Sequence, residues 1–201
     1  MRIRTLSCIL LVLALLFLSC NERIAWAAPF SSNPEFKFMQ RYRTKRDQRN
    51  RLKAIETYFS RKNSRVSARN IQHYAKLIDE YSARYDLDPF LVASILVKES
   101  TVKEKAVSRG NYGLMQINWK ANKPWIVKSL PVRSTKDLLN PENNIRLGAT
   151  ILSANIKKSG GDVDKGLDKY RGRSLASYRN SVLSHYTAIA RIFRQLQPAS
   201  I

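Results

Sequence analysis

The feature that most constrains the fold is an almost wholly apolar stretch, Phe-Leu-Val-Ala-Ser-Ile-Leu-Val, over residues 90–97. Asp88 and Pro89 precede it, a pair suited to the cap and the first position of a helix. Lys98, Glu99 and Ser100 follow it. A helix that is apolar on nearly every side belongs in the centre of a domain. The sequence therefore predicts a central helix with Glu99 at its far end.

The rest of the C-terminal two thirds also indicates helices. Apolar residues at helical spacing predict helices over about 71–84, 141–156, 163–170 and 175–196. Asn140 and Pro141 repeat the cap-then-proline start, and Gly160 and Gly161 stop that helix. No segment shows convincing strand alternation and no repeat period is visible. We therefore expect one all-α (predominantly α) domain over residues 67–197, preceded by a basic N-terminal segment.

The first residues are typical of a targeting signal. Arg2 and Arg4 precede an uncharged apolar run over residues 6–19, which is shorter than the roughly 20 residues that a membrane span needs. Two processing sites are possible. The small-x-small pattern Ala25-Trp26-Ala27 predicts a signal peptide of residues 1–27, whereas the lipobox-like Phe17-Leu18-Ser19-Cys20 predicts a lipoprotein signal of residues 1–19 and a lipidated Cys20. An uncleaved anchor is a third alternative, which the length of the run disfavours.

Composition limits the chemistry that the chain can carry. The formal net charge is +21, which favours a polyanionic partner without saying which one. Cys8 and Cys20 both lie in the targeting segment, so we expect no disulfide in the mature fold. His73 and His185 have no ligand partners at metal-site spacing, so we expect no metal. A Ser-His-Asp or Cys-His nucleophile is poorly supported for the same reason.

Residues 28–66 form the expected basic segment. The stretch 28–48 is rich in proline, serine and basic residues with little apolar periodicity, and predicts a linker. From about residue 47 to 60, Leu52, Ile55 and Phe59 recur at helical spacing among basic residues. This amphipathic helix would either lie on an anionic envelope surface or pack on the domain through those three side chains, and we favour packing.

Glu99 is the candidate for chemistry. Burial at the end of an apolar helix would raise the pKa of its carboxyl group, as a general acid at neutral pH requires. The ordinary alternative is an exposed residue at a helix end. The next acidic residues are Glu104, which we interpret as a surface charge between Lys103 and Lys105, and then Asp137.

Several short motifs follow Glu99 in a characteristic order: Glu99-Ser100, Ala106-Val107-Ser108, Gly113-Leu114-Met115-Gln116-Ile117, Asn140-Pro141-Glu142-Asn143-Asn144-Ile145, and Gly148. Together they resemble the soluble-lytic-transglycosylase (SLT) catalytic domain, a lysozyme-like fold, over roughly residues 68–190. The resemblance implies that Glu99 is the catalytic acid and base and that Ser108 lies beside the sugar ring. It also implies a glycan groove lined by Gly113, Leu114, Met115 and Gln116. Met115 as core filler and Ser108 as a turn cap remain the ordinary alternatives, and we expect Asn144 and Gly148 to serve helix packing.

One motif departs from the family. The family usually has Ala-Tyr-Asn-x-Gly where this chain has Lys169-Tyr170-Arg171-Gly172. By the resemblance, Tyr170 would bind substrate and its hydroxyl would orient Glu99. Arg171 in place of asparagine would instead lower the pKa of Glu99. Tyr178 matches an aromatic residue farther along, for which we expect core packing.

The resemblance implies a peptidoglycan lytic transglycosylase that cleaves between MurNAc and GlcNAc and leaves 1,6-anhydro-MurNAc ends. One glutamate would act as acid and then as base, without a cofactor, because the substrate's acetamido group can replace a second carboxylate. Alternatives are a hydrolytic muramidase and a non-catalytic peptidoglycan-binding module. A nucleic-acid binder is disfavoured by the export signal. We expect a monomer in the periplasm or cell envelope, at the outer membrane if Cys20 is lipidated.

Overall fold

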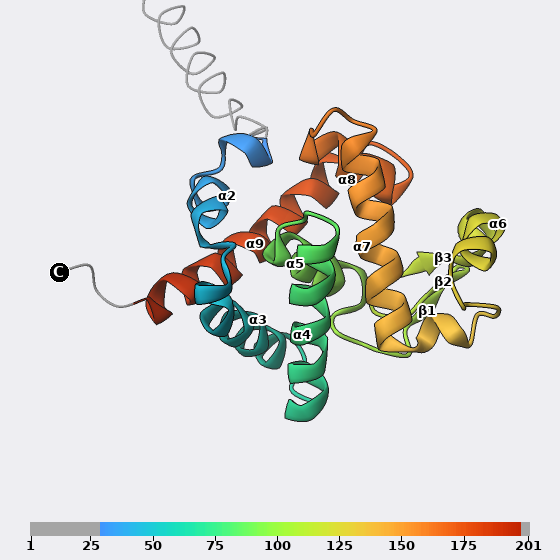
Figure 1. Cartoon of the computed structure of the whole chain (residues 1–201), viewed down its shortest axis with the longest axis horizontal. Helices are drawn as coiled ribbons and strands as arrows, with labels where there is room; N and C mark the ends of the chain where they lie inside the picture. The colour runs from blue at the N-terminus through green and yellow to red at the C-terminus, as the bar shows by residue number, and fades with distance from the viewer. Residues whose placement is uncertain (1–28, 198–201) are drawn as a thin grey trace, which may run out of the picture.

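The computed structural model describes residues 29–197, so both expected processing sites lie outside the described residues. Figure 1 shows helices gathered around one centre with a small sheet at one edge. The elements are η1 (Phe30–Ser32), α2 (Pro34–Met39), η2 (Gln40–Tyr42), η3 (Lys45–Asp47), α3 (Gln48–Lys62), α4 (Ala68–Arg84), α5 (Pro89–Ser100), β1 (Val107–Ser108), β2 (Asn111–Tyr112), β3 (Ile117–Asn118), α6 (Trp119–Ser129), η4 (Asp137–Leu139), α7 (Pro141–Lys157), α8 (Val163–Arg171) and α9 (Ala176–Leu196). The predominantly α fold is confirmed.

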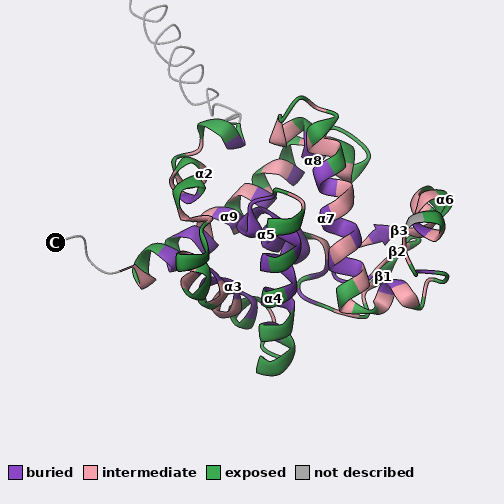
Figure 2. Cartoon of the chain, viewed as in Figure 1, coloured by how far each residue is buried: buried purple, intermediate pink, exposed green. Residues whose placement is uncertain are grey.

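Helix α5 is the centre of the domain. Every residue from Pro89 to Val97 is buried, and the helix packs against α9, α4 and α3 (Figure 2). The Asp88 carboxylate accepts a 2.8 Å hydrogen bond from the backbone N–H of Phe90 and so caps the helix. The helix ends where Thr101 takes the left-handed conformation at φ 52°. The expected central helix with Glu99 next to its last residue is confirmed.

The structure contains a three-stranded antiparallel sheet in the order β1-β2-β3 that the sequence did not indicate. Each strand has two residues, so no alternation of apolar and polar side chains can develop. Helix α6 was also missed. Asn118 caps it by accepting a 2.9 Å hydrogen bond from the N–H of Ala121, but Pro124 lies inside it and breaks the sequence signal.

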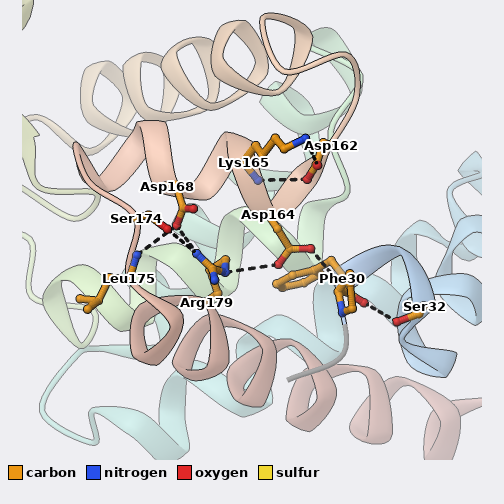
Figure 3. A network of polar contacts seen from close by, with 10 residues as sticks. Phe30, Ser32, Asp162, Asp164, Lys165, Asp168, Ser174, Leu175 and Arg179 are labelled. Atoms are coloured by element: carbon orange, nitrogen blue, oxygen red, sulfur yellow. Dashed lines mark hydrogen bonds and ion pairs between the residues drawn. The ribbon is translucent and has the colours of Figure 1, made fainter. Parts of the chain in front are cut away.

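The stretch expected to be a linker is instead folded onto the domain. Phe30 and Met39 are each 1% exposed and belong to the hydrophobic core. The ring of Phe30 meets those of Phe36 and Tyr186 at 5.7 Å. Its N–H donates a 2.9 Å hydrogen bond to Asp164 on α8 (Figure 3). The apolar residues are spread over three short helical turns rather than one helix, so no single period reveals them.

Helix α3 is packed on the domain, which is the alternative that we favoured. Ile55 and Phe59 are fully buried, and Leu52 packs at the margin of the core. Arg51 is only 5% exposed and forms an ion pair with Asp79 of α4 at 3.0 Å. Its guanidinium also donates to the carbonyls of Tyr42 and Thr44, at 2.8 and 2.6 Å, and thereby ties the N-terminal segment down. Within residues 29–197, no helix is both long and apolar enough to cross a membrane.

Candidate functional site

A groove of about 410 Å³ opens beside the last turn of α5. The sheet, α6, α7 and the end of α8 form its other walls. Its lining residues are Glu99 from α5, Asn111, Gln116, Ile117 and Asn118 from the sheet region, Ala121 and Asn122 from α6, Ile151 and Asn155 from α7, and Lys169, Tyr170, Arg171 and Gly172 at the end of α8. Amides and cations therefore surround a single carboxylate.

Glu99 is half-buried in this groove and held in place. The Tyr178 hydroxyl donates a 2.7 Å hydrogen bond to its Oε1 atom. Burial raises the pKa of the Glu99 carboxyl group, while the Tyr178 hydrogen bond and the charges of Arg171 and Lys98 lower it. Burial is the largest of these effects, and the pKa stays above its ordinary value. More of the carboxyl group is therefore protonated near neutral pH than in an exposed glutamate.

Tyr178 makes a contact with Glu99 that the sequence interpretation did not predict. It lies on α9 and is 3% exposed, as core packing requires, but its hydroxyl also reaches the carboxylate. Burial and the nearby Glu99 charge raise its pKa far above the ordinary value for tyrosine. It therefore stays neutral and remains a hydrogen-bond donor. Because 79 residues separate it from Glu99, no local pattern reveals the pair.

Tyr170 lines the groove but does not make the contact expected of it. Its hydroxyl donates a 2.9 Å hydrogen bond to the carbonyl of Met115. The Glu99 charge adds to burial in raising the pKa of Tyr170, so the two groups are near each other without being joined. Tyr170 thus fastens α8 to the loop 113–116.

The loop 113–116 contributes one of its four expected residues, Gln116, to the groove. Leu114 and Met115 are fully buried in the core. Gly113 adopts φ +79°, and a Cβ atom there would lie 2.2 Å from the Asn144 side chain. Only Gln116 lines the groove, where its Nε2 donates to the carbonyls of Ala106 and Gly113 at 3.1 and 3.0 Å.

Asn144 and Gly148 fix the loop from behind, as their expected packing role requires. The Asn144 amide accepts a 2.7 Å hydrogen bond from the N–H of Met115 and donates to the carbonyl of Tyr112 at 2.8 Å. A Cβ atom on Gly148 would lie 2.3 Å from the Met115 sulfur atom. Glycine at position 148 therefore lets the loop approach α7 closely.

Ser108 is exposed on β1 and lies outside the lining of the groove. It pairs with Asn111 of β2, which in turn pairs with Asn118 of β3. Directly paired residues of antiparallel strands project from the same face. Ser108 therefore ends a polar row whose other two members line the groove. Sequence reasoning did not single out these asparagines or Asn155 of α7. Within residues 29–197, the side chains of Asn111 and Asn155 make no hydrogen bond, so both amides are available to a ligand.

Residues 169–172, the motif that differs from the family pattern, form the end of α8 beside the groove. Gly172 adopts φ +80° and its N–H bonds to the carbonyl of Lys169, which is a glycine cap. Arg171 is exposed and forms no ion pair within the described part of the chain. Its charge lowers the pKa of Glu99, as the sequence predicts, but burial outweighs that effect.

Glu104 does not reach the groove. It accepts a 2.6 Å hydrogen bond from Tyr74 and forms an ion pair with Lys105 at 2.6 Å. Among the described residues that line the groove, Glu99 is the single carboxylate. Two carboxylates placed for a nucleophile or an activated water are therefore not found in the groove.

Comparison with known proteins identifies the domain. Residues 76–192, more than half of the chain, match the family described as transglycosylase SLT domain. The curated relatives include proteins named endo-type membrane-bound lytic murein transglycosylase A from Salmonella paratyphi B, Salmonella enteritidis and Salmonella typhimurium. Each is 30% identical over 95 residues, covering 45% of this chain and 47% of the relative. The chain thus spans about half the length of these relatives. No solved structure matches significantly. The chain belongs to the transglycosylase SLT domain family.

Proposed function

We propose that this protein is a peptidoglycan lytic transglycosylase that cleaves the β-1,4 bond between MurNAc and GlcNAc. The observation that carries the proposal is a single half-buried glutamate with a raised pKa in a groove lined by amides and cations. Membership of the SLT family and the names of the curated relatives support the same activity.

In the first step, protonated Glu99 donates its proton to the glycosidic oxygen, and the bond between that oxygen and C1 of MurNAc breaks. The resulting positive charge at C1 is stabilised by the 2-acetamido oxygen of the same sugar, which takes the place of a second carboxylate. Amide groups of Gln116, Asn111 and Asn155 line the groove and are suited to hold that acetamido group. The Tyr178 hydroxyl stabilises the Glu99 carboxylate that forms.

In the second step, the Glu99 carboxylate accepts the proton of the MurNAc O6 hydroxyl, and O6 forms a bond to C1. The product is a 1,6-anhydro-MurNAc end, Glu99 regains its proton and no water is consumed. An attacking group on the same sugar has a large entropic advantage over water. The reaction requires no cofactor.

The proposal also accounts for the charge of the protein and predicts its location. The net charge of +21 suits peptidoglycan stems, which bear carboxylates, and other anionic envelope polymers. We place the protein in the cell envelope, processed after Ala27 or lipidated at Cys20. The name of the relatives supports an envelope location.

The test is mass spectrometry of the products released from purified peptidoglycan. Anhydro-muropeptides are expected from the wild type, and Glu99→Gln should lower their release by about 10³-fold, because general acid catalysis contributes about 10² to 10⁴. The matched control is Glu80→Gln, which removes an exposed glutamate paired with Arg84 on α4. Products with reducing ends would establish a muramidase instead. Binding without release by the wild type would leave a peptidoglycan-binding module.

A further inference from the structure

A second cavity, of about 690 Å³, lies between the α3–α4 turn and the chain that follows α5. Lys62, Asn63 and Arg65 form one side, and Thr101, Lys103 and Glu104 belong to the other. It shares no lining residue with the Glu99 groove. Thr101 is nevertheless two residues from Glu99, which places their Cα atoms within about 7 Å of each other. The two sites are therefore joined along the chain by the short step from Glu99 to Thr101 at the end of α5.

The pocket is positively charged and its cations are not neutralised. Lys62, Arg65 and Lys103 form no ion pair within residues 29–197, whereas the carboxylate of Glu104 is already satisfied by Lys105 and Tyr74. Lys98 is next to Glu99 in the sequence, and its charge, like that of Lys62, lowers the pKa of His185 after the larger effect of burial. Such a cluster of like charges is unfavourable in isolation and is stabilised by an anionic ligand.

The walls of the pocket are fixed rather than loose. The Asn63 side chain donates a 3.0 Å hydrogen bond to the carbonyl of Thr101 and joins the two sides. Thr101 and Val102 both adopt positive φ, at 52° and 59°, which is rare for residues branched at Cβ. Val102 is fully buried, so packing holds this conformation in place.

The pocket also depends on parts of the chain outside the family match. The match begins at residue 76, whereas Lys62, Asn63 and Arg65 belong to α3 and the turn after it. One wall of the pocket is therefore supplied by the segment that precedes the matched region.

We propose that this pocket binds the carboxylates of the peptide stem attached to the glycan strand that occupies the Glu99 groove. The inference rests on the proposed function, because the stem is the anionic part of peptidoglycan that is tethered to the sugar. Lysine and arginine side chains form charge-assisted hydrogen bonds with carboxylates. A concave pocket favours a peptide end over a bilayer, which would meet a flatter surface.

The first experiment compares two substrates, intact peptidoglycan and glycan strands stripped of stems by an amidase. The variant Lys62→Gln/Arg65→Gln/Lys103→Gln is matched with Arg46→Gln/Arg49→Gln/Lys53→Gln, which removes three exposed charges around the other end of α3. The wild type should cleave intact peptidoglycan about tenfold faster than stripped strands, as expected for one or two charged hydrogen bonds. The pocket variant should bring this ratio close to one, and the control should keep it. An equal loss on both substrates, or an equal ratio in both variants, would overturn the proposal.

The second experiment is independent of turnover. Titration of a synthetic stem peptide, with free or amidated carboxylates, is followed by NMR on wild type and Glu99→Gln. Both proteins should bind the free acid about tenfold more tightly than the amide, and the pocket variant should lose this preference. A preference with no cleavage of either substrate would refute the proposed function alone. No preference, or tighter binding to vesicles of anionic phospholipid than to the peptide, would refute the stem pocket.

Discussion

Glu99 and Glu104 lie five residues apart, yet the structure gives their carboxyl groups opposite properties. Glu99 ends the buried helix, where loss of water dominates and its pKa is raised. Glu104 lies in the following turn, where burial also raises the pKa, but the hydrogen bonds from Lys105 and Tyr74 and the charges of Lys105 and His73 together leave it below the ordinary value. One site keeps its proton more readily than an exposed glutamate and the other loses it more readily.

The difference shows what suits Glu99, and not Glu104, to the acid role that we propose. Cations are near both residues, but Lys105 touches Glu104 at 2.6 Å, whereas Glu99 has a neutral tyrosine at 2.7 Å and its cations farther away. A neutral donor orients the carboxyl group with less stabilisation of the charged form than a touching cation provides. The position of Tyr178 is therefore as informative as the burial of Glu99.

Among the variants that test the contrast between Glu99 and Glu104, Tyr178→Phe is expected to have the largest effect on activity. It removes the hydroxyl that orients Glu99 and should lower kcat/KM by about tenfold, the value of one hydrogen bond to a charged group. Because that hydrogen bond lowers the pKa of Glu99, its loss should raise the pKa. The alkaline limb of the pH–rate profile should then move to higher pH. Tyr170→Phe is the matched control, since that hydroxyl bonds to Met115, and its alkaline limb should stay in place. A limb that moves in both variants, or in neither, would contradict the assignment.

A smaller effect is expected from Arg171→Asn, which introduces the residue usual in the family. Removing the positive charge raises the pKa of Glu99, so the alkaline limb should again move upward, with a change in rate of about threefold or less. Arg171→Lys keeps the charge and should leave the limb unmoved. Because Arg171 is exposed, the shift should shrink as salt is added. A shift of equal size in the lysine variant would mean that the shape of the side chain matters rather than its charge.

The smallest effect is on stability, and its sign should differ between the two glutamates. The raised pKa of Glu99 means that the folded state loses stability as pH rises above the unfolded value of about 4.3. Glu99→Gln should therefore raise the unfolding temperature at pH 8, with no gain below pH of about 4. The lowered pKa of Glu104 contributes stability above that value, which is lost as pH falls through the folded pKa. Glu104→Gln should lower the unfolding temperature at pH 8.

Scanning calorimetry at pH 8 and pH 4 measures both changes. They should amount to a few degrees, since about 1 kcal/mol corresponds to about 2–4 °C in a protein of this size. Shifts of the same sign in the two variants at pH 8 would show that the contrast between the two carboxyl groups is wrong.

Much of the fold follows from sequence because its signals are local. The caps at Asp88 and Asn140 and the apolar helix between Pro89 and Val97 depend on neighbours along the chain. Placement of Glu99 at the end of that helix follows from the same pattern. The family motifs predict the groove, but they assign to Tyr170 the contact that Tyr178 makes, because both are tyrosines near one end of neighbouring helices.

What sequence does not reveal depends on contacts between distant segments. Pairing of Ser108 with Asn111 needs strands that are too short to show a pattern. Seating of Phe30 beside Tyr186 joins residues from opposite ends of the domain. Leu114 and Met115, expected along the groove, are buried in the core, and Met115 lies in the space that Gly148 leaves on α7.

The N-terminal segment is part of the folding unit, so the domain is larger than the sequence alone predicts. Phe30 and Met39 fill the core, Arg51 balances the buried Asp79, and Gln40 donates a 3.3 Å hydrogen bond to the buried Asp88. A fragment cut at Ser67, where the sequence alone places the boundary, would uncover apolar surface and leave the buried Asp79 carboxylate of α4 without its partners Gln48 and Arg51. The region that matches the SLT family shares its core with the N-terminal segment. Its folding therefore depends on residues that precede the family match. A fusion protein that contains the domain must include them.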